Sequence, residues 1–222
     1  MPTMPTQVTR EVHCTDGVAW LRAQTPLPPT HALLTSMPDV SELGGASLEA
    51  WKSWFVDAAT ACLNAVSDNN VALFYQTDIK KQGTWVDKAY LVQRAAEACG
   101  SALLWHKVVC RVQSGHATFG RPGYAHLLCF SKKLRTDPGS STPDVIPKLG
   151  PMTWARAMGL EPCRAMVRFA AKHANATTIV DPFCGVGTAL AVANGLGLHA
   201  VGVELSNKRA AKARNLQLPS PD

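Results

Sequence analysis

Residues 177–188 read Thr177-Thr178-Ile179-Val180-Asp181-Pro182-Phe183-Cys184-Gly185-Val186-Gly187-Thr188, and this stretch decides the fold. Its first part is a short, β-branched apolar run, which is typical of a buried parallel strand. Gly185 and Gly187 then form a turn whose backbone can come close to a ligand, because no side chain stands in the way. A helical run from Ala189 to Asn194 follows. The stretch therefore predicts a strand, a ligand-binding turn and a helix in succession.

A second apolar run, Ala200 to Val203, lies about twenty residues further on and predicts the next strand. It ends at Glu204, which precedes Leu205. An acid at this place can accept hydrogen bonds from both hydroxyls of a ribose, as in nucleotide-binding β-α-β units. The alternatives are a dinucleotide site and a glycine turn that binds no ligand. A dinucleotide site would require a third glycine where this chain has Leu190.

Composition sets bounds on the class of protein. The chain has 222 residues, 46% of them hydrophobic, which suffices for one α/β domain over residues 1–222. The net charge of +6 is compatible with a polyanionic partner but does not require one. The apolar runs are too short to span a membrane, and the polar N-terminal residues predict no signal peptide.

Cysteine and histidine usage points to an intracellular protein. The seven cysteines are scattered, odd in number and without a C-x-x-C pair, so we expect reduced thiols in the cytoplasm or nucleus. The histidines show no metal-ligand spacing, and no metal is expected.

Hydrophobic periodicity predicts strands alternating with helices. The expected strands are 8–14, 31–35, 71–75, 102–112, 124–130, 177–181 and 200–203, and the expected helices are 18–23, 47–62, 85–98, 153–158, 161–172, 189–194 and 207–215. Residues 80–83 are expected to be a charged loop, and residues 135–151 a linker. This alternation predicts a Rossmann-like, doubly wound, mostly parallel sheet, with 102–112 and 124–130 as an antiparallel pair at one edge.

Polar residues follow the predicted strands at their carboxyl ends, where ligands bind in such folds. They are Asp16, Ser36, Asp78, Asp181 and Glu204. One crevice could collect them all. For Asp16 the alternative is a helix N-cap.

The run Asp181 to Thr188 together with Glu204 resembles the cofactor motif of S-adenosylmethionine-dependent methyltransferases. It is similar to the D-P-F-x-G-x-G-T form of enzymes that methylate exocyclic amines of DNA or RNA bases. The motif comes last here, which resembles the circularly permuted order of that group, and the resemblance covers nearly the whole chain. It implies cofactor contacts from Asp16, Asp181, Pro182, Phe183, Gly185, Gly187, Thr188, Glu204 and Leu205. It also places residues 153–172 beside the methionine end of the cofactor.

The resemblance matches Ser36-Met37-Pro38-Asp39 to the catalytic tetrapeptide, which usually reads Asp, Asn or Ser, then Pro-Pro, then an aromatic. It implies that Ser36 Oγ and the Met37 carbonyl accept the N–H groups of the target amine. An ordinary turn is the alternative. Asp39 cannot supply the stacking of the missing aromatic. We hypothesise that it contacts substrate, and the alternative is that it only caps the next turn.

Other rings are then needed to stack on a base, and Tyr75, Phe119 and Tyr124 are candidates. A substrate rim is expected from Asp78, Lys80, Arg121 and Tyr124, with a solvated loop as the alternative. Trp51, Trp54 and Phe55 are expected in the core, and the basic run 208–214 on a helix face.

Sequence-specific DNA members of the group usually carry a large recognition insert, but the corresponding place here holds only the segment 137–148. We therefore favour an RNA amino-methyltransferase that reads shape more than sequence. A DNA amino-methyltransferase that relies on a partner protein is the second hypothesis. The third is a non-catalytic binding or scaffold subunit that retains the cofactor fold. The sequence is compatible with an oligomer or a partner protein and leaves the oligomeric state open.

Overall fold

The computed structural model describes residues 7–81 and 83–218, and its main feature is an eight-stranded sheet within those residues. In spatial order the strands are β1 (Arg10–His13), β10 (His199–Val203), β9 (Thr178–Asp181), β2 (His31–Thr35), β3 (Ala72–Gln76), β7 (Tyr124–Ser131), β6 (Ala102–Cys110) and β8 (Val145–Ile146). In this spatial order, each of the first five strands is parallel to its neighbours among those five, whereas β7 runs antiparallel to both β3 and β6. The predicted mostly parallel sheet with an antiparallel pair is therefore confirmed.

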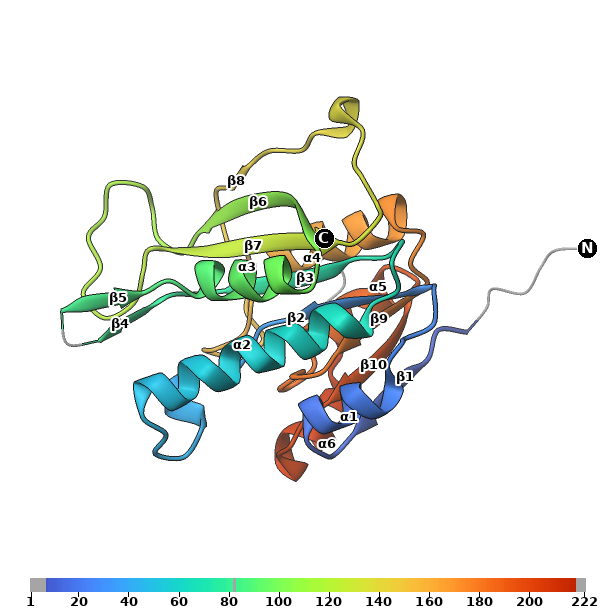
Figure 1. The fold of residues 1–222 in the computed structure, drawn as a ribbon, viewed down its shortest axis with the longest axis horizontal. Helices are drawn as coiled ribbons and strands as arrows, with labels where there is room; N and C mark the ends of the chain where they lie inside the picture. The colour runs from blue at the N-terminus through green and yellow to red at the C-terminus, as the bar shows by residue number, and fades with distance from the viewer. Residues whose placement is uncertain (1–6, 82, 219–222) are drawn as a thin grey trace, which may run out of the picture.

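Helices cover both faces of this sheet (Figure 1). On one face lie α1 (Gly17–Gln24), α2 (Leu48–Ala65) and α3 (Lys88–Ala98), and on the other α4 (Leu160–His173), α5 (Thr188–Gly195) and α6 (Asn207–Asn215). The apolar face predicted for α2 is the face that packs on the sheet, because Trp51, Phe55 and Cys62 are all fully buried there. The result is a three-layer arrangement with a separate apolar core on each face of the sheet.

The strand that carries the glycine motif, β9, lies between β10 and β2 although it comes late in the chain. Its neighbours are thus drawn from both ends of the sequence, which is the permuted order expected above. Because β2, β3, β9 and β10 are parallel, their carboxyl ends meet at one edge of the sheet.

The structure differs from the predictions first in the region before α3. The charged loop at 80–83 is instead a hairpin of β4 (Ile79–Lys81) and β5 (Thr84–Val86), because Gly83 adopts φ +77° and Thr84 to Val86 favour a strand. The next helix accordingly starts at Lys88, with Asp87 as its cap, and not at Trp85. Gln82 lies outside the described residues.

The expected helix 153–158 is a single turn, closed by the Ala157 N–H donating to the Trp154 carbonyl, and it stops at the Gly159 cap of α4. The linker also holds more structure than expected. The short 3-10 helix η2 (Pro138–Ser140) precedes β8, which pairs in parallel with β6. The antiparallel pair therefore sits one strand in from the edge.

Candidate functional site

A cavity of about 220 Å³, here called the motif cavity, opens at the carboxyl ends of β9, β10 and β2. It brings together most of the residues predicted from the cofactor motif and the tetrapeptide. These are Asp16, Ser36, Met37, Pro38, Asp181, Pro182, Phe183, Gly185, Thr188, Glu204 and Leu205. Four of the five strand-end residues expected in one crevice thus line this cavity, which is assembled from distant parts of the chain, whereas Asp78 does not line it.

The two motif glycines differ in what they do. Gly185 has φ +57° and lines the motif cavity, with only Trp154 near the place of a side chain. Gly187 has φ +91°, and a Cβ on it would lie 2.8 Å from the Ala213 Cα of α6. It does not line the cavity. The expectation that Gly187 lets the backbone approach a ligand is therefore corrected, because the close neighbour is a helix.

Asp181 is a buried carboxyl at the end of β9. Its Oδ1 accepts hydrogen bonds from Thr35 Oγ1 at 2.7 Å and from the Phe183 N–H at 3.1 Å. Burial nevertheless raises the pKa of Asp181 to about 7, because the hydrogen bonds offset only part of the desolvation. The carboxyl holds the turn in shape and is poised to be protonated near neutrality.

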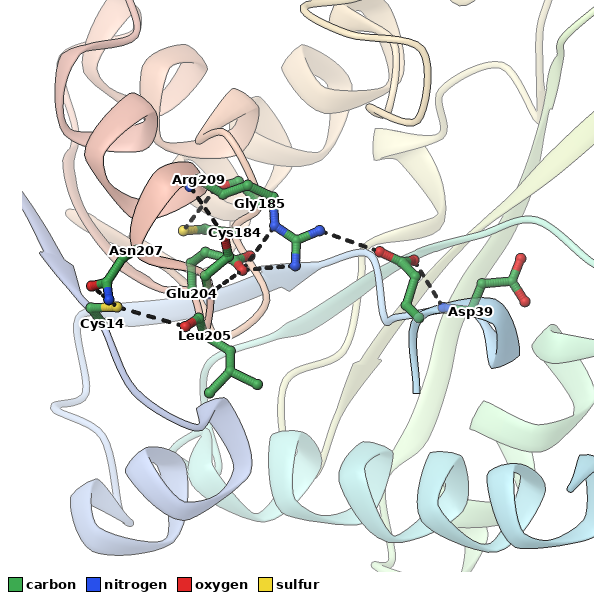
Figure 2. Close-up of polar contacts among 10 residues, drawn as sticks. Cys14, Asp39, Cys184, Gly185, Glu204, Leu205, Asn207 and Arg209 are labelled. Atoms are coloured by element: carbon green, nitrogen blue, oxygen red, sulfur yellow. Dashed lines mark hydrogen bonds and ion pairs between the residues drawn. The ribbon is translucent and has the colours of Figure 1, made fainter. Parts of the chain in front are cut away.

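Glu204 is 6% exposed, and its Oε1 already accepts hydrogen bonds within the protein. That oxygen accepts from the Ser206 N–H at 2.7 Å and from Arg209 Nε at 2.9 Å (Figure 2). No hydrogen bond connects Oε2 to a described residue. Since Glu204 lines the motif cavity, this second oxygen is the one that can accept from a ligand.

Arg209 belongs to the basic run that was expected on a helix face, with added phosphate affinity as the alternative, and it lies in the site. It lines the motif cavity and also lies 3.5 Å from Glu42 Oε2. Glu42 in turn accepts from the Asp39 N–H at 3.1 Å. The acid at the end of β10 is thereby linked to the loop that carries the tetrapeptide. The contact joins residues 167 positions apart, and no local pattern signals it.

Asp16 combines both roles considered for it. Its side chain accepts from the Ala19 N–H at 2.7 Å and caps α1, and it also lines the motif cavity. Trp54, expected in the core, is only partly buried. It lines the cavity beside Phe183, with 6.0 Å between the ring centroids. Trp51 and Phe55 are core residues, as predicted.

The tetrapeptide stands between the motif cavity and a second cavity of about 150 Å³. Ser36 and Met37 line both, as do Glu42, Arg156 and Ala157. Trp51 Nε1 donates to the Pro38 carbonyl at 3.3 Å, so the core holds the tetrapeptide in place. Trp154 lines the motif cavity, and Arg156 lines both cavities. Both residues belong to the segment 153–158 that was expected to be helical. No motif in the sequence singles out either residue for the site.

Asp39 caps the following turn, which is the alternative considered for it. Its Oδ1 accepts from the Val40 N–H at 2.7 Å, within a capping box shared with Glu42. Asp39 also lines the second cavity, and in Figure 2 its carboxylate points away from Arg209. A substrate contact for Asp39 therefore stays a prediction.

Asp78 lines the second cavity but is already engaged by three groups. Its Oδ1 accepts from the Lys88 N–H at 2.9 Å, and its Oδ2 accepts from His126 Nε2 at 3.0 Å and from the Tyr124 hydroxyl at 3.3 Å. Burial acts to raise the pKa of Asp78, but these hydrogen bonds outweigh it and bring the pKa below its usual value. The geometry favours a structural acid that fixes the wall of the cavity.

The rest of the predicted rim surrounds this cavity. Lys80 and Arg121 line it, and Lys80 Nζ also donates to the Thr118 carbonyl and lies 4.6 Å from the Trp85 ring centroid. One face of the Tyr124 ring lies toward Trp85, with 6.4 Å between the ring centroids, and a stacking role for Tyr124 stays a prediction. Of the other candidate rings, Tyr75 lines the cavity and Phe119 is 96% exposed outside it.

Among residues 7–81 and 83–218, one group has ligand atoms close enough for a metal, namely Asp78, Asp87 and His126. Two of them bond to each other and Asp87 caps α3, so hydrogen bonds already account for the cluster. All seven cysteines are free thiols. In the described part of the chain no helix is both long and apolar enough to cross a membrane.

The chain is an α/β protein, and its fold matches that of solved methyltransferase structures over nearly its whole length. A putative DNA modification methylase from Thermus thermophilus, TTHA0409 in complex with S-adenosyl-L-methionine, has a TM-score of 0.69 at 19% identity, covering 93% of each chain. The cytosine-N4-specific PvuII DNA methyltransferase has a TM-score of 0.74 at 13% identity, covering 96% of this chain and 88% of its own. The M1.HpyAVI–SAM complex has a TM-score of 0.63 at 12% identity, covering 93% and 98%. No protein-family model and no curated protein sequence matches the chain. The predicted fold is thus confirmed. At sequence identities below 20%, these similarities show the fold and not the function.

Proposed function

We propose that this chain is an S-adenosylmethionine-dependent methyltransferase acting on an exocyclic amine of a nucleic-acid base. The observation that carries the proposal is the meeting of two cavities at Ser36 and Met37. The first is lined by the glycine turn and Glu204, and the second by strand ends and basic side chains. A group-transfer enzyme needs such adjacency, because donor and acceptor must meet at one point.

The residues of the motif cavity suit the cofactor. Glu204 offers a free oxygen in a buried setting for the ribose hydroxyls, and Trp54 and Phe183 offer an apolar wall for a ring. Arg156 is a cation that can pair with the carboxylate of the methionine end. When bound, the cofactor supplies an electrophilic methyl group on a sulfonium.

The tetrapeptide is proposed to orient the nucleophile. An exocyclic amine reacts poorly because its lone pair is delocalised into the ring. Ser36 Oγ and the Met37 carbonyl can accept its N–H groups and so localise that lone pair. Their positions are held by the Trp51–Pro38 hydrogen bond and by the burial of Met37, which is 3% exposed. Such fixed acceptors lower the cost of reaching a reactive geometry.

DNA is the first substrate to test, because the solved structures of similar fold include proteins named as DNA methyltransferases. The preference for RNA drawn from the sequence receives no support from them. RNA remains a second candidate substrate because the chain has no large segment at the place where sequence-specific DNA enzymes usually carry a recognition insert. Segment 137–148 holds only η2 and β8, which cannot fill a major groove with base-reading side chains.

The test measures transfer of tritiated methyl from S-adenosylmethionine to duplex DNA, single-stranded DNA and total RNA, with cofactor affinity determined by calorimetry. We expect cofactor binding and label in DNA. The Ser36→Ala variant should bind cofactor as the wild type does and transfer methyl more slowly, because Ser36 acts mainly in the transition state. Label in RNA alone would reverse the order of substrates. Absence of cofactor binding would overturn the proposal, and binding without transfer to any nucleic acid would favour a non-catalytic subunit.

A further inference from the structure

Lys88, the first residue of α3, is an unusual feature of the second cavity. The residue is 4% exposed and lines that cavity. Its Nζ lies over two core rings, 5.5 Å from the Trp51 centroid and 5.7 Å from the Phe55 centroid. Its backbone N–H is anchored on Asp78. Within the described chain, no hydrogen bond or ion pair engages its ammonium.

A buried ammonium without a hydrogen-bond acceptor is costly, and most buried polar groups have one. Burial lowers the pKa of Lys88, while the charges of Asp39, Glu42 and Asp78 act in the opposite direction. These carboxylates all line the same cavity, as does Arg121, whose charge lowers the pKa of Lys88 as burial does. An acceptor that belongs to the occupant of the cavity would complete its hydrogen bonding.

The position of Lys88 restricts what that occupant can be. Lys80, Arg111, Arg121 and Arg156 also line this cavity, and these more exposed cations can meet phosphate. Lys88 differs from them because it is buried over two core rings, with Asp39, Glu42 and Asp78 acting on its charge. A neutral heterocycle with a ring acceptor suits such a buried donor. Trp51 also places Lys88 near the tetrapeptide, because the same indole donates to the Pro38 carbonyl.

We propose that Lys88 donates a hydrogen bond to the ring nitrogen beside the amine of the target base, and so selects bases in which an amine adjoins a ring acceptor. This inference rests on the proposed function. Cytosine presents N4–H₂ beside N3, and adenine presents N6–H₂ beside N1, so each offers donors to Ser36 and Met37 and an acceptor to Lys88. In guanine the amine adjoins the N1–H donor on the Watson–Crick edge and the N3 acceptor on its other side, so guanine presents an acceptor to Lys88 only when it enters with N3 toward the ammonium.

The test removes the ring nitrogen and the ammonium separately and together. Mixed-sequence oligonucleotides carry either the natural base or its deaza analogue, 3-deazacytosine or 1-deazaadenine, at every position of that base. Lys88→Met retains the length of the side chain over Trp51 and Phe55 but has no donor. The wild type should lose about 10- to 100-fold in kcat/KM on the deaza base. Lys88→Met should lose a similar factor on the natural base and nothing further on the deaza base, with cofactor affinity unchanged.

An equal deaza penalty in the wild type and in Lys88→Met would overturn the proposal, because the ammonium would then not contact that nitrogen. A loss that is equal on all substrates and grows weaker with salt would assign Lys88 to phosphate instead, and would also overturn it. If Lys88→Met fails to fold, Lys88→Gln retains one amide donor and should show a reduced deaza penalty. A wild type that methylates neither base would contradict the proposed function itself, before any variant is compared.

Discussion

At the residue scale, Glu204 and Asp181 are both buried carboxyls in the motif cavity, but their surroundings give them different chemistry. Glu204 has a cation beside it, the guanidinium of Arg209, whereas Asp181 has only neutral hydrogen-bond donors. A buried carboxylate stays charged mainly when a cation or several donors compensate it. Glu204, with its Oε2 free toward the motif cavity, is therefore suited to accept hydrogen bonds from hydroxyls, and Asp181 to serve as a structural group.

The first prediction concerns Glu204. Replacing it with alanine removes the acceptor proposed for the ribose hydroxyls, and cofactor affinity should weaken by about 1–3 kcal/mol. Calorimetry with S-adenosylmethionine measures this. Glu42→Gln is the matched control, because it removes the other carboxylate near Arg209 but leaves Glu204 in place. Unchanged affinity in Glu204→Ala would refute the assignment.

The second prediction uses the raised pKa of Asp181. In the folded protein this carboxyl holds its proton up to about pH 7, whereas in the unfolded chain it loses the proton near pH 4. The folded state is therefore favoured by protonation, and this contribution is lost as pH rises between those values. Asp181→Asn mimics the protonated form, because both hydrogen bonds fall on Oδ1.

Asp181→Asn should accordingly raise the free energy of unfolding relative to the wild type at pH 8, by up to about 4 kcal/mol, and this difference should shrink toward pH 5. Urea titrations of both proteins without cofactor at the two pH values provide the measurement. A difference that does not change with pH would show that Asp181 is ionised throughout the range.

At the element scale, the close approach of α5 and α6 depends on one glycine. Gly187 has a positive φ, and a Cβ on it would lie 2.8 Å from the Ala213 Cα and 3.0 Å from its Cβ. Gly195, at the other end of α5, has open space around it and an ordinary φ. The same substitution at the two ends of one helix should therefore have opposite effects.

The third prediction is that Gly187→Ala destabilises the protein by about 1–3 kcal/mol or more, through backbone strain and the clash with α6. Gly195→Ala should be neutral or stabilise by up to about 1 kcal/mol. The melting temperatures of both variants, measured by thermal unfolding and compared with that of the wild type, test this prediction. Equal melting temperatures would mean that α6 can move away without cost.

The elements that could be predicted from the sequence are those set by local chemistry. The β-branched run before Gly185 and the spacing of Trp51, Phe55 and Cys62 each specify one element without help from the rest of the chain. The hairpin before α3 was missed because Lys80 and Lys81 suggested a solvated loop, whereas cross-strand pairing with Thr84 and Trp85 decides their conformation.

The parts of the site that could not be predicted are contacts between distant segments. Arg209 contacts Glu42 only after α6 and the tetrapeptide loop have been brought to the same edge of the sheet. Lys88 resembles an ordinary surface lysine at the start of a helix, and only the packing of α2 against α3 buries it. The two functions of Asp16, cap and cavity wall, likewise become visible only in three dimensions.

At the scale of the whole molecule, a net charge of +6 and the rim of the second cavity suggest how nucleic acid would be held. The fourth prediction is that binding is weak and sensitive to salt and has little sequence preference. Each phosphate contact adds about −0.9 to the slope of log K against log salt for duplex DNA. Removing Lys80 and Arg121 together should therefore make the slope shallower by up to about 2.

The matched control is Lys133→Ala, which removes one positive charge at the opposite end of β7, where Lys133 pairs with Asp68 on the surface. Fluorescence anisotropy over a series of salt concentrations measures both slopes, and the control should match the wild type. Tight binding to one duplex sequence over scrambled competitors, by the protein alone, would contradict the prediction.

The position of β9 in the chain also bears on how the protein is made. Ribosomes release the N-terminus first, but among the described residues β1 pairs only with β10, and the Thr9 amide bonds to His199, 190 residues later. One edge of β2 likewise stays unpaired until β9 has been synthesised. Until β9 and β10 have been translated, the apolar edges of β1 and β2 are therefore exposed to other nascent chains. The growing polypeptide should depend on chaperones until the segment with the glycine turn emerges and closes the sheet.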